Sequence, residues 1–161
     1  MNILKLELTH FGKFHLKTIT FTSGLNIVYG KNEAGKSTIH AFVRSMLFGI
    51  PDTEEGNERY SHYLPWETPH DFCGRMWIKK DDKVYRIERN FLRPQPTVRV
   101  FDDETGESLQ PAKQHLRQIL SGLTETSYLN TICIEQLKSA TDPQLAKELE
   151  DMAVNASQSK N

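Results

Sequence analysis

The sequence predicts an α/β fold, because a short apolar run, a glycine-rich loop and a helical pattern follow one another and several β-like runs come later. The apolar run covers residues 25–29 (LNIVY), the loop covers residues 30–37, and apolar side chains recur at helical spacing over residues 39–47. With 161 residues, 37% of them hydrophobic, the chain is long enough for one globular domain with its own core. This composition excludes a disordered or collagen-like protein.

The N-terminal residues predict a β-hairpin. Residues 4–8 alternate leucine with charged side chains, which is the pattern of a strand with one buried face. After a turn at residues 10–12, the apolar residues of a second strand at 14–21 change parity, which predicts a β-bulge near residues 17–18. The run at 25–29 then has the pattern of a strand buried on both faces.

The middle of the chain predicts one helix, one long loop and three strands. Gly49 and Pro51 end the helix that begins in the glycine-rich loop. Residues 51–70 are acidic, rich in turn residues and without periodicity, so we expect a functional or mobile loop there. Residues 74–101 contain three β-like runs separated by an Asp-Asp pair and by prolines, which predicts an antiparallel meander.

The C-terminal third predicts a helix, a strand and the beginning of another helix. Pro111 and Gly122 mark the ends of the first of these helices, and residues 131–136 (TICIEQ) have the pattern of a buried strand. An Asp-Pro pair then begins a charged helix with an apolar stripe. We therefore expect a lobe at residues 1–142 and, at residues 143–161, the start of a coiled-coil helix that the chain truncates.

Charge and cysteine content limit the function classes. Residues 1–50 and 71–100 are net basic and the rest is net acidic, but the total charge is −1, so charge alone does not predict nucleic-acid binding. Cys73 and Cys133 lack the spacing of a metal or redox site and fit a reducing compartment. No run of eighteen apolar residues or signal-peptide pattern is found. We expect a cytoplasmic protein with no membrane partner.

Residues 30–37 carry the most specific chemistry of the chain. They read GKNEAGKS, which satisfies the GxxxxGK[ST] pattern directly between a buried strand and an amphipathic helix. The loop and the helix N-terminus would surround the phosphates with N–H groups, Lys36 would reach the β- and γ-phosphates, and Ser37 would ligate Mg²⁺. This P-loop predicts a nucleotide-binding set of Gly30, Lys31, Asn32, Glu33, Ala34, Gly35, Lys36, Ser37 and Thr38.

The same residues carry a family resemblance. The order of strand, FGKF, strand, LNIVYGKNEAGKST and a helix ending in LFG resembles the N-terminal lobe of the SMC- and SbcC-like ATPases of the ABC class, most closely the YhaN-type bacterial members. The YRIERNF run and the segment YLNTICIEQL extend the resemblance over most of the chain. It implies a P-loop NTPase lobe with a mixed β-sheet and an antiparallel meander around the P-loop helix, and ATP as the nucleotide.

The resemblance also implies roles for two further residues. Gln136, near the end of YLNTICIEQL, would contact Mg²⁺ and the attacking water, and would form the catalytic pair with Lys36. Lys13, near the first turn, would approach the base or ribose. In such proteins a coiled coil and a C-terminal lobe follow, with the signature motif and the Walker B acids. We therefore expect this chain to bind Mg-ATP with little turnover, and hydrolysis to need that lobe and a homodimer formed through ATP.

The biological setting implied by the resemblance is DNA repair or chromosome maintenance, with DNA and an SbcD-like metallophosphoesterase nuclease as partners. The meander is rich in cations that would either contact DNA phosphates or form a solvated sheet face, and the sequence leaves both interpretations open. These cations are Lys79, Lys80, Lys83, Arg86, Arg89, Arg93 and Arg99.

Two other functions remain open. A small P-loop kinase would use Lys36 and Ser37 equally well, although we find no arginine-rich lid or substrate acid. A non-catalytic module, in which nucleotide orders the domain for a partner, is the second. Residues 120–122 (LSG) resemble the start of a signature motif, and residues 102–104 (DDE) resemble Walker B acids. We interpret the first as a helix end and the second as a hairpin turn.

Overall fold

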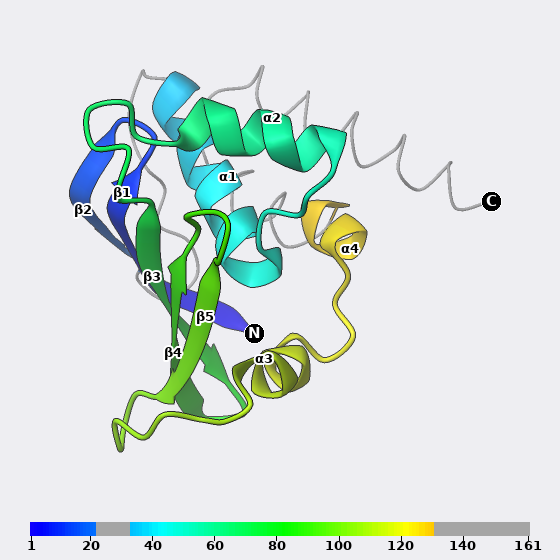
Figure 1. The fold of residues 1–161 in the computed structure, drawn as a ribbon. Helices are drawn as coiled ribbons and strands as arrows, with labels where there is room; N and C mark the ends of the chain where they lie inside the picture. Colours follow the sequence, from blue (N-terminus) through cyan, green and yellow to red (C-terminus); the bar gives the residue numbers. More distant parts are fainter. Residues whose placement is uncertain (22–32, 131–161) are drawn as a thin grey trace.

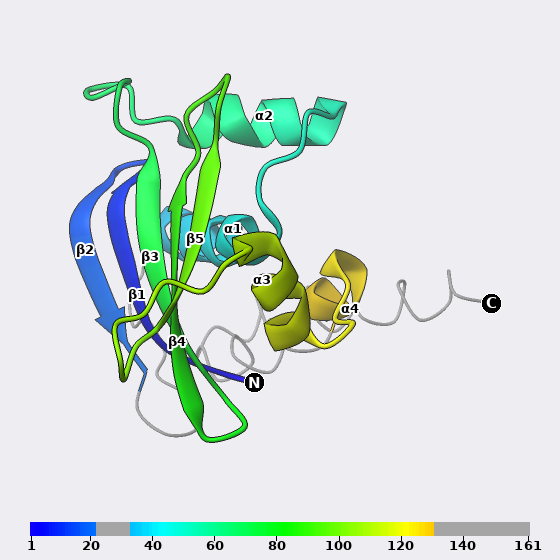
Figure 2. The same ribbon diagram turned by 60° about the horizontal axis from the view of Figure 1, so that its bottom comes forward.

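A computed structural model describes residues 1–21 and 33–130 of the chain. The strands are β1 (Asn2–Phe11), β2 (Phe14–Thr20), β3 (Cys73–Lys80), β4 (Lys83–Asn90) and β5 (Thr97–Asp102). The helices are α1 (Glu33–Phe48), α2 (Glu54–Tyr63), α3 (Ala112–Leu120) and α4 (Glu125–Asn130). Figure 1 and Figure 2 show α1 beside one face of the sheet, α2 at the end that carries the β1–β2 turn, and α3 near β5.

The five strands form one antiparallel sheet in the order β2-β1-β3-β4-β5. The predicted hairpin and the predicted meander are both confirmed, and β1 joins them by pairing with β3 from Asn2 opposite Lys79 to His10 opposite Cys73. The predicted mixed sheet depends on residues 25–29 and 131–136, which lie outside the described residues. The proposed boundary between residues 1–142 and 143–161 also lies outside them.

Side chains in register across four strands form the floor of the core. Leu6, Met76, Ile87 and Val100 are paired neighbours on β1, β3, β4 and β5, and none is exposed to solvent. α1 contacts β1, β3 and β4 and buries the predicted apolar face of its helical pattern, including Phe42 at 0% exposure. Burying each large apolar side chain stabilises the fold by about 1.5–3 kcal/mol, so this layer is the main source of stability.

Gly74 allows α1 to approach the sheet this closely. A Cβ atom at Gly74 would overlap the ring of Phe42, 2.5 Å from its Cζ, and would lie 3.1 Å from the carbonyl oxygen of Glu7. The interior of a protein is packed too tightly to accept such an atom without displacement. Glycine is therefore required at this strand position by packing.

The β-bulge predicted near residues 17–18 is wrong. The pairing of β1 with β2 keeps one register from Lys5 opposite Thr20 to Phe11 opposite Phe14. The side-chain parity changes at Leu16, which takes a positive φ of 51° and is 62% exposed, whereas Phe14 before it and Ile19 after it both pack against the core. β2 therefore changes parity without an inserted residue opposite β1.

The loop predicted at residues 51–70 is wrong over residues 54–63, which form α2. Thr53 caps the helix, because its Oγ1 accepts a hydrogen bond from the Gly56 N–H at 3.0 Å. Glu54 and Glu55 in the first turn interact favourably with the positive end of the helix dipole. The helical pattern is hard to recognise because its buried face includes an arginine, Arg59, in place of aliphatic residues.

Both simpler interpretations of the motif-like matches are confirmed. Ser121, with a φ of 48°, ends α3 in the left-handed conformation. Asp102 organises a hairpin turn, because its Oδ1 accepts hydrogen bonds from the N–H groups of Glu104 and Thr105 at 3.0 and 3.2 Å. Among the described helices, none has both the length and the apolar character needed to cross a membrane.

Candidate functional site

The predicted phosphate loop runs into the first turn of α1. The helix begins at Glu33, so Lys36 and Ser37 belong to its N-terminal turns, whereas residues 30–32 lie outside the described residues. The first N–H groups of a helix have no partner within the helix and carry a partial positive charge, which suits an anion. The helix therefore includes residues 33–37, which the sequence placed in the loop, and the phosphate-binding role of the motif stays a prediction.

The turn between β1 and β2 lies directly beside this part of α1. Gly12 has a φ of 59°, and a Cβ atom there would lie 3.2 Å from Cγ2 of Thr38 and 3.3 Å from Cδ1 of Tyr63. Lys13, the next residue, is exposed on the same turn. Two predicted nucleotide-binding segments, the turn with Lys13 and the helix start with Thr38, are therefore neighbours in space.

α2 holds this turn in place. The N–H of Gly12 donates a hydrogen bond to the carbonyl oxygen of Tyr63 at 2.7 Å. The Tyr63 ring stacks on Phe11 with centroids 5.2 Å apart, and Phe11 meets the edge of Phe42 at 5.1 Å. Burial raises the pKa of the Tyr63 hydroxyl, with Arg59 acting in the opposite direction. Sequence reasoning assigns no role to Tyr63, although its helical spacing from Gly56 and Arg59 is a usable signal.

The other end of α1 is closed by Arg89 of β4. Its Nε donates to the carbonyl oxygen of Met46 at 2.6 Å and its Nη2 to that of Leu47 at 3.4 Å. A cation at a helix C-terminus complements the negative end of the helix dipole. Burial lowers the pKa of Arg89 to about 10, so the side chain remains charged at neutral pH. Arg89 is thus an internal cap of α1 and does not belong to an exposed DNA surface.

Two more of the seven meander cations make contacts within the chain. Arg93 donates to Oδ1 of Asn57 at 2.6 Å and lies over the ring of Tyr60, 4.4 Å from its centroid. Lys80 donates to the carbonyl oxygens of Gln118 and Ile119 at the end of α3, at 2.9 and 2.6 Å. The seven cations therefore do not all belong to a single DNA-contacting surface.

The remaining cations lie on the face of the sheet opposite α1 or at the turns between its strands. Arg86 is held between Glu88 and Asp103, at 3.4 Å from each, and its guanidinium lies 4.5 Å from the ring centroid of Phe101. Lys79, Lys83 and Arg99 are the exposed members of the set. These three members of the set are accessible to an anionic partner.

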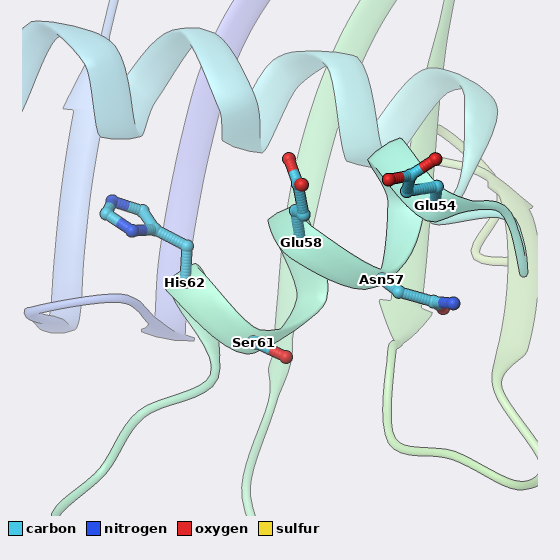
Figure 3. A pocket seen from close by; sticks show the side chains of 5 residues that line it. All are labelled: Glu54, Asn57, Glu58, Ser61 and His62. Carbon is cyan, nitrogen blue, oxygen red and sulfur yellow. The ribbon is translucent and has the colours of Figure 1, made fainter.

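The histidines of residues 51–70 belong to no metal-binding cluster among the described residues. Within the described part of the chain, no group of three His, Cys, Asp or Glu side chains is placed to hold a metal ion. His62 lies on the exposed side of α2, where it borders an open hollow with Glu54, Asn57, Glu58 and Ser61 (Figure 3). The predicted Mg²⁺ ligands are a separate matter, because Gln136 lies outside the described residues and Ser37 is placed only as part of α1.

One family model and two curated relatives match the chain. A model of an AAA domain matches residues 1–153. The chain is 43% identical over 56 residues to the uncharacterized protein YhaN of Bacillus subtilis, covering 34% of this chain and 6% of that protein. It is 26% identical over 146 residues to the DNA double-strand break repair Rad50 ATPase of Thermococcus kodakarensis, covering 84% of this chain and 15% of that protein. These matches confirm the resemblance to the SMC- and SbcC-like ATPases, and the chain spans a small part of the length of both relatives.

Proposed function

Because the chain belongs to the AAA domain family, we propose that it is the Mg-ATP-binding half-site of an ATPase of the SMC and SbcC class. The observation that carries the proposal is the start of α1 inside the GxxxxGK[ST] motif, with the turn of Lys13 packed beside Thr38. A helix N-terminus and a second, cationic turn on the same side provide positive charge for a triphosphate. The role of Lys13 at the base or ribose is part of this proposal.

The residues would divide the work as follows. Lys36 neutralises the β- and γ-phosphates, and the N–H groups at the start of α1 bind their oxygens. Ser37 and Gln136 would hold Mg²⁺, which would supply charge neutralisation at the phosphate oxygens, and Gln136 would orient the attacking water. The anchored C-terminal end of α1 would help to fix the helix that carries Lys36 and Ser37 while the nucleotide binds.

This half-site is incomplete as a catalyst. Phosphoryl transfer needs stabilising groups on both sides of the γ-phosphate, and the residues above approach it from one side. We therefore expect hydrolysis to need a C-terminal lobe with the signature motif and Walker B acids, and an ATP-bound homodimer. The isolated chain would bind Mg-ATP with little turnover. A kinase, by contrast, would transfer phosphate to an acceptor without a second lobe.

DNA and an SbcD-like nuclease are the proposed partners of the complete protein. Support comes from the Rad50 relative, which is described as a DNA double-strand break repair ATPase, and from the exposed cations Lys79, Lys83 and Arg99. Each phosphate contact from such a cation would add to the salt dependence of binding. The cytoplasm is the expected compartment.

Titration calorimetry of the 161-residue chain with Mg-ATP tests the nucleotide site. We expect saturable binding that Lys36→Ala weakens about 30-fold or more, since a charge-assisted bond to phosphate contributes about 2 kcal/mol or more. Lys83→Ala is the matched control, because it removes an exposed lysine at the far turn between β3 and β4. Equal weakening by both variants, or no binding by the unmodified chain, would reject the proposal.

A further inference from the structure

Four charged side chains join three helices on the far side of α1 from its contact with the sheet. We call this group the arginine junction: Arg44 of α1, Glu55 and Arg59 of α2, and Glu125 of α4. Arg44 Nη1 lies 3.2 Å from Glu55, and Arg44 Nε forms a close ion pair with Glu125. α1, which starts in the phosphate loop, is thereby tied to α4, which leads directly to residues 131–136.

Arg59 is the unusual member of the arginine junction. Only 6% of it is exposed, and among the described residues its buried Nε and Nη1 atoms have no hydrogen-bond partner. Its carboxylate neighbours are at ion-pair distance, 3.5 Å for Glu55 and 3.8 Å for Glu125. Nη2 of Arg59 donates a hydrogen bond to the carbonyl oxygen of Gly49 at 3.4 Å, so the guanidinium is only partly satisfied. Buried donors without partners are costly, and Nε and Nη1 therefore leave stabilisation of Arg59 unrealised.

Glu125 is shared unequally between the two arginines. It is bonded to Arg44 but lies 3.8 Å from Arg59, so a shift of α4 by about 1 Å would bring it within hydrogen-bond distance of Arg59. Movement in that direction would give Nη1 of Arg59 a hydrogen bond at the expense of the Arg44 contact. The arginine junction would thus allow a second arrangement of similar chemistry, in which α4 lies closer to Arg59.

We propose that Arg59 and Glu125 are positioning residues that couple nucleotide binding at α1 to the position of α4, through exchange of Glu125 between Arg44 and Arg59. The inference rests on the proposed function, in which ATP binds at the start of α1. Arg44 lies on that helix and contacts Glu125 of α4, so nucleotide binding would favour one of the two arrangements. By thermodynamic linkage, the factor by which ATP shifts the equilibrium between the two arrangements equals the factor by which their ATP affinities differ.

Hydrogen exchange of residues 125–130, measured on the 161-residue chain with and without Mg-ATP, tests this coupling. We expect Mg-ATP to slow exchange there about fivefold or more, as a coupling of about 1 kcal/mol or more requires. Glu125→Gln should remove this protection and weaken ATP binding by a similar factor. Glu58→Gln is the matched control, because Glu58 is an exposed carboxylate on the open side of α2 (Figure 3).

Arg59→Met separates coupling from stability. Replacing a buried, poorly bonded cation by an apolar side chain of similar length is often neutral or stabilising, so this variant should fold. It leaves Glu125 with Arg44 alone and should abolish the ATP-dependent protection of residues 125–130 while the melting temperature stays unchanged or rises. A merely structural role for Arg59 predicts the opposite pattern, with lower stability and intact protection.

The possible results separate the inference from the proposed function. Saturable ATP binding with equal protection in Arg59→Met, Glu125→Gln and Glu58→Gln overturns the coupling and leaves the nucleotide site intact. Absence of ATP binding by the unmodified chain overturns both. Binding with protection that is lost only in the two junction variants establishes the coupling.

Discussion

The two ends of α1 differ in how completely their polar groups are satisfied. At the C-terminal end, Arg89 bonds the carbonyl oxygens of Met46 and Leu47, and the adjacent side chains are fully buried. At the N-terminal end, helix geometry leaves N–H groups available beside the Gly12 turn. One end is thus anchored and the other retains binding capacity. In the proposed function, this difference would let the N-terminal end of α1 bind phosphate while its C-terminal end stays anchored.

The largest expected effect comes from a substitution that disrupts the packing of α1 against the sheet. Gly74→Ala should lower the free energy of unfolding by about 2–3 kcal/mol, because the new methyl group overlaps the Phe42 ring. Urea unfolding followed by circular dichroism measures the change. The double variant with Phe42→Leu removes the overlapping ring atoms and should cost less than the sum of the single changes. Simple additivity of the two would show that Gly74 is not needed for this contact.

The next effect tests the cap of α1 directly. Arg89→Leu should destabilise the chain by about 2 kcal/mol, because two carbonyl oxygens at the buried helix end lose charge-assisted hydrogen bonds. Arg99→Leu, an exposed cation on the neighbouring strand, is the control and should change stability little. If both substitutions have the same effect in thermal unfolding, the asymmetry between the two ends of α1 is not real.

A smaller effect concerns α2, which supports the Gly12 turn near the N-terminal end of α1. Thr53→Ala removes the side chain that accepts the Gly56 N–H and should cost about 1 kcal/mol. Thr53→Ser keeps the hydroxyl and should retain most of the stability. Urea unfolding of both variants measures the difference. An equal loss for alanine and serine would attribute the effect to the threonine methyl group and exclude the cap.

Much of the fold was predictable because its signals are local. Alternating residues identify β1, β3 and β4, and helical spacing with Gly49 identifies α1. α2 was missed because its buried face includes Arg59, whose burial depends on partners from other helices. The union of the hairpin and the meander in one sheet was not predictable, because pairing between distant strands leaves no mark in either strand alone.

The same distinction applies to the site. The GxxxxGK[ST] motif lies within eight consecutive residues, so the sequence could predict its role and its place at the start of α1. The contact between Gly12 and Thr38 depends on the fold, and the spacing of residues in the sequence does not predict it. Arg89 was interpreted with the exposed cations because nothing in a strand sequence shows which cation will meet a helix end. Chemistry that resides in one segment is predictable, and chemistry assembled from several segments requires the structure.

The smallest expected effect is a pH dependence from His40, which lies between the two ends of α1. Burial, with the nearby cations Arg44 and Arg59, lowers the pKa of His40 below 6.5. The unfolded chain therefore binds the proton more readily, so His40 lowers stability as the pH falls below 6.5 and has no effect well above it. Thermal unfolding of His40→Gln should show a flatter loss of stability between pH 7.5 and 5.5, a range set by the reference pKa of about 6.5. An unchanged slope would mean that His40 is as easily protonated in the folded chain as in the unfolded one, and that the middle of α1 is more open to water than either the anchored end or the arginine junction.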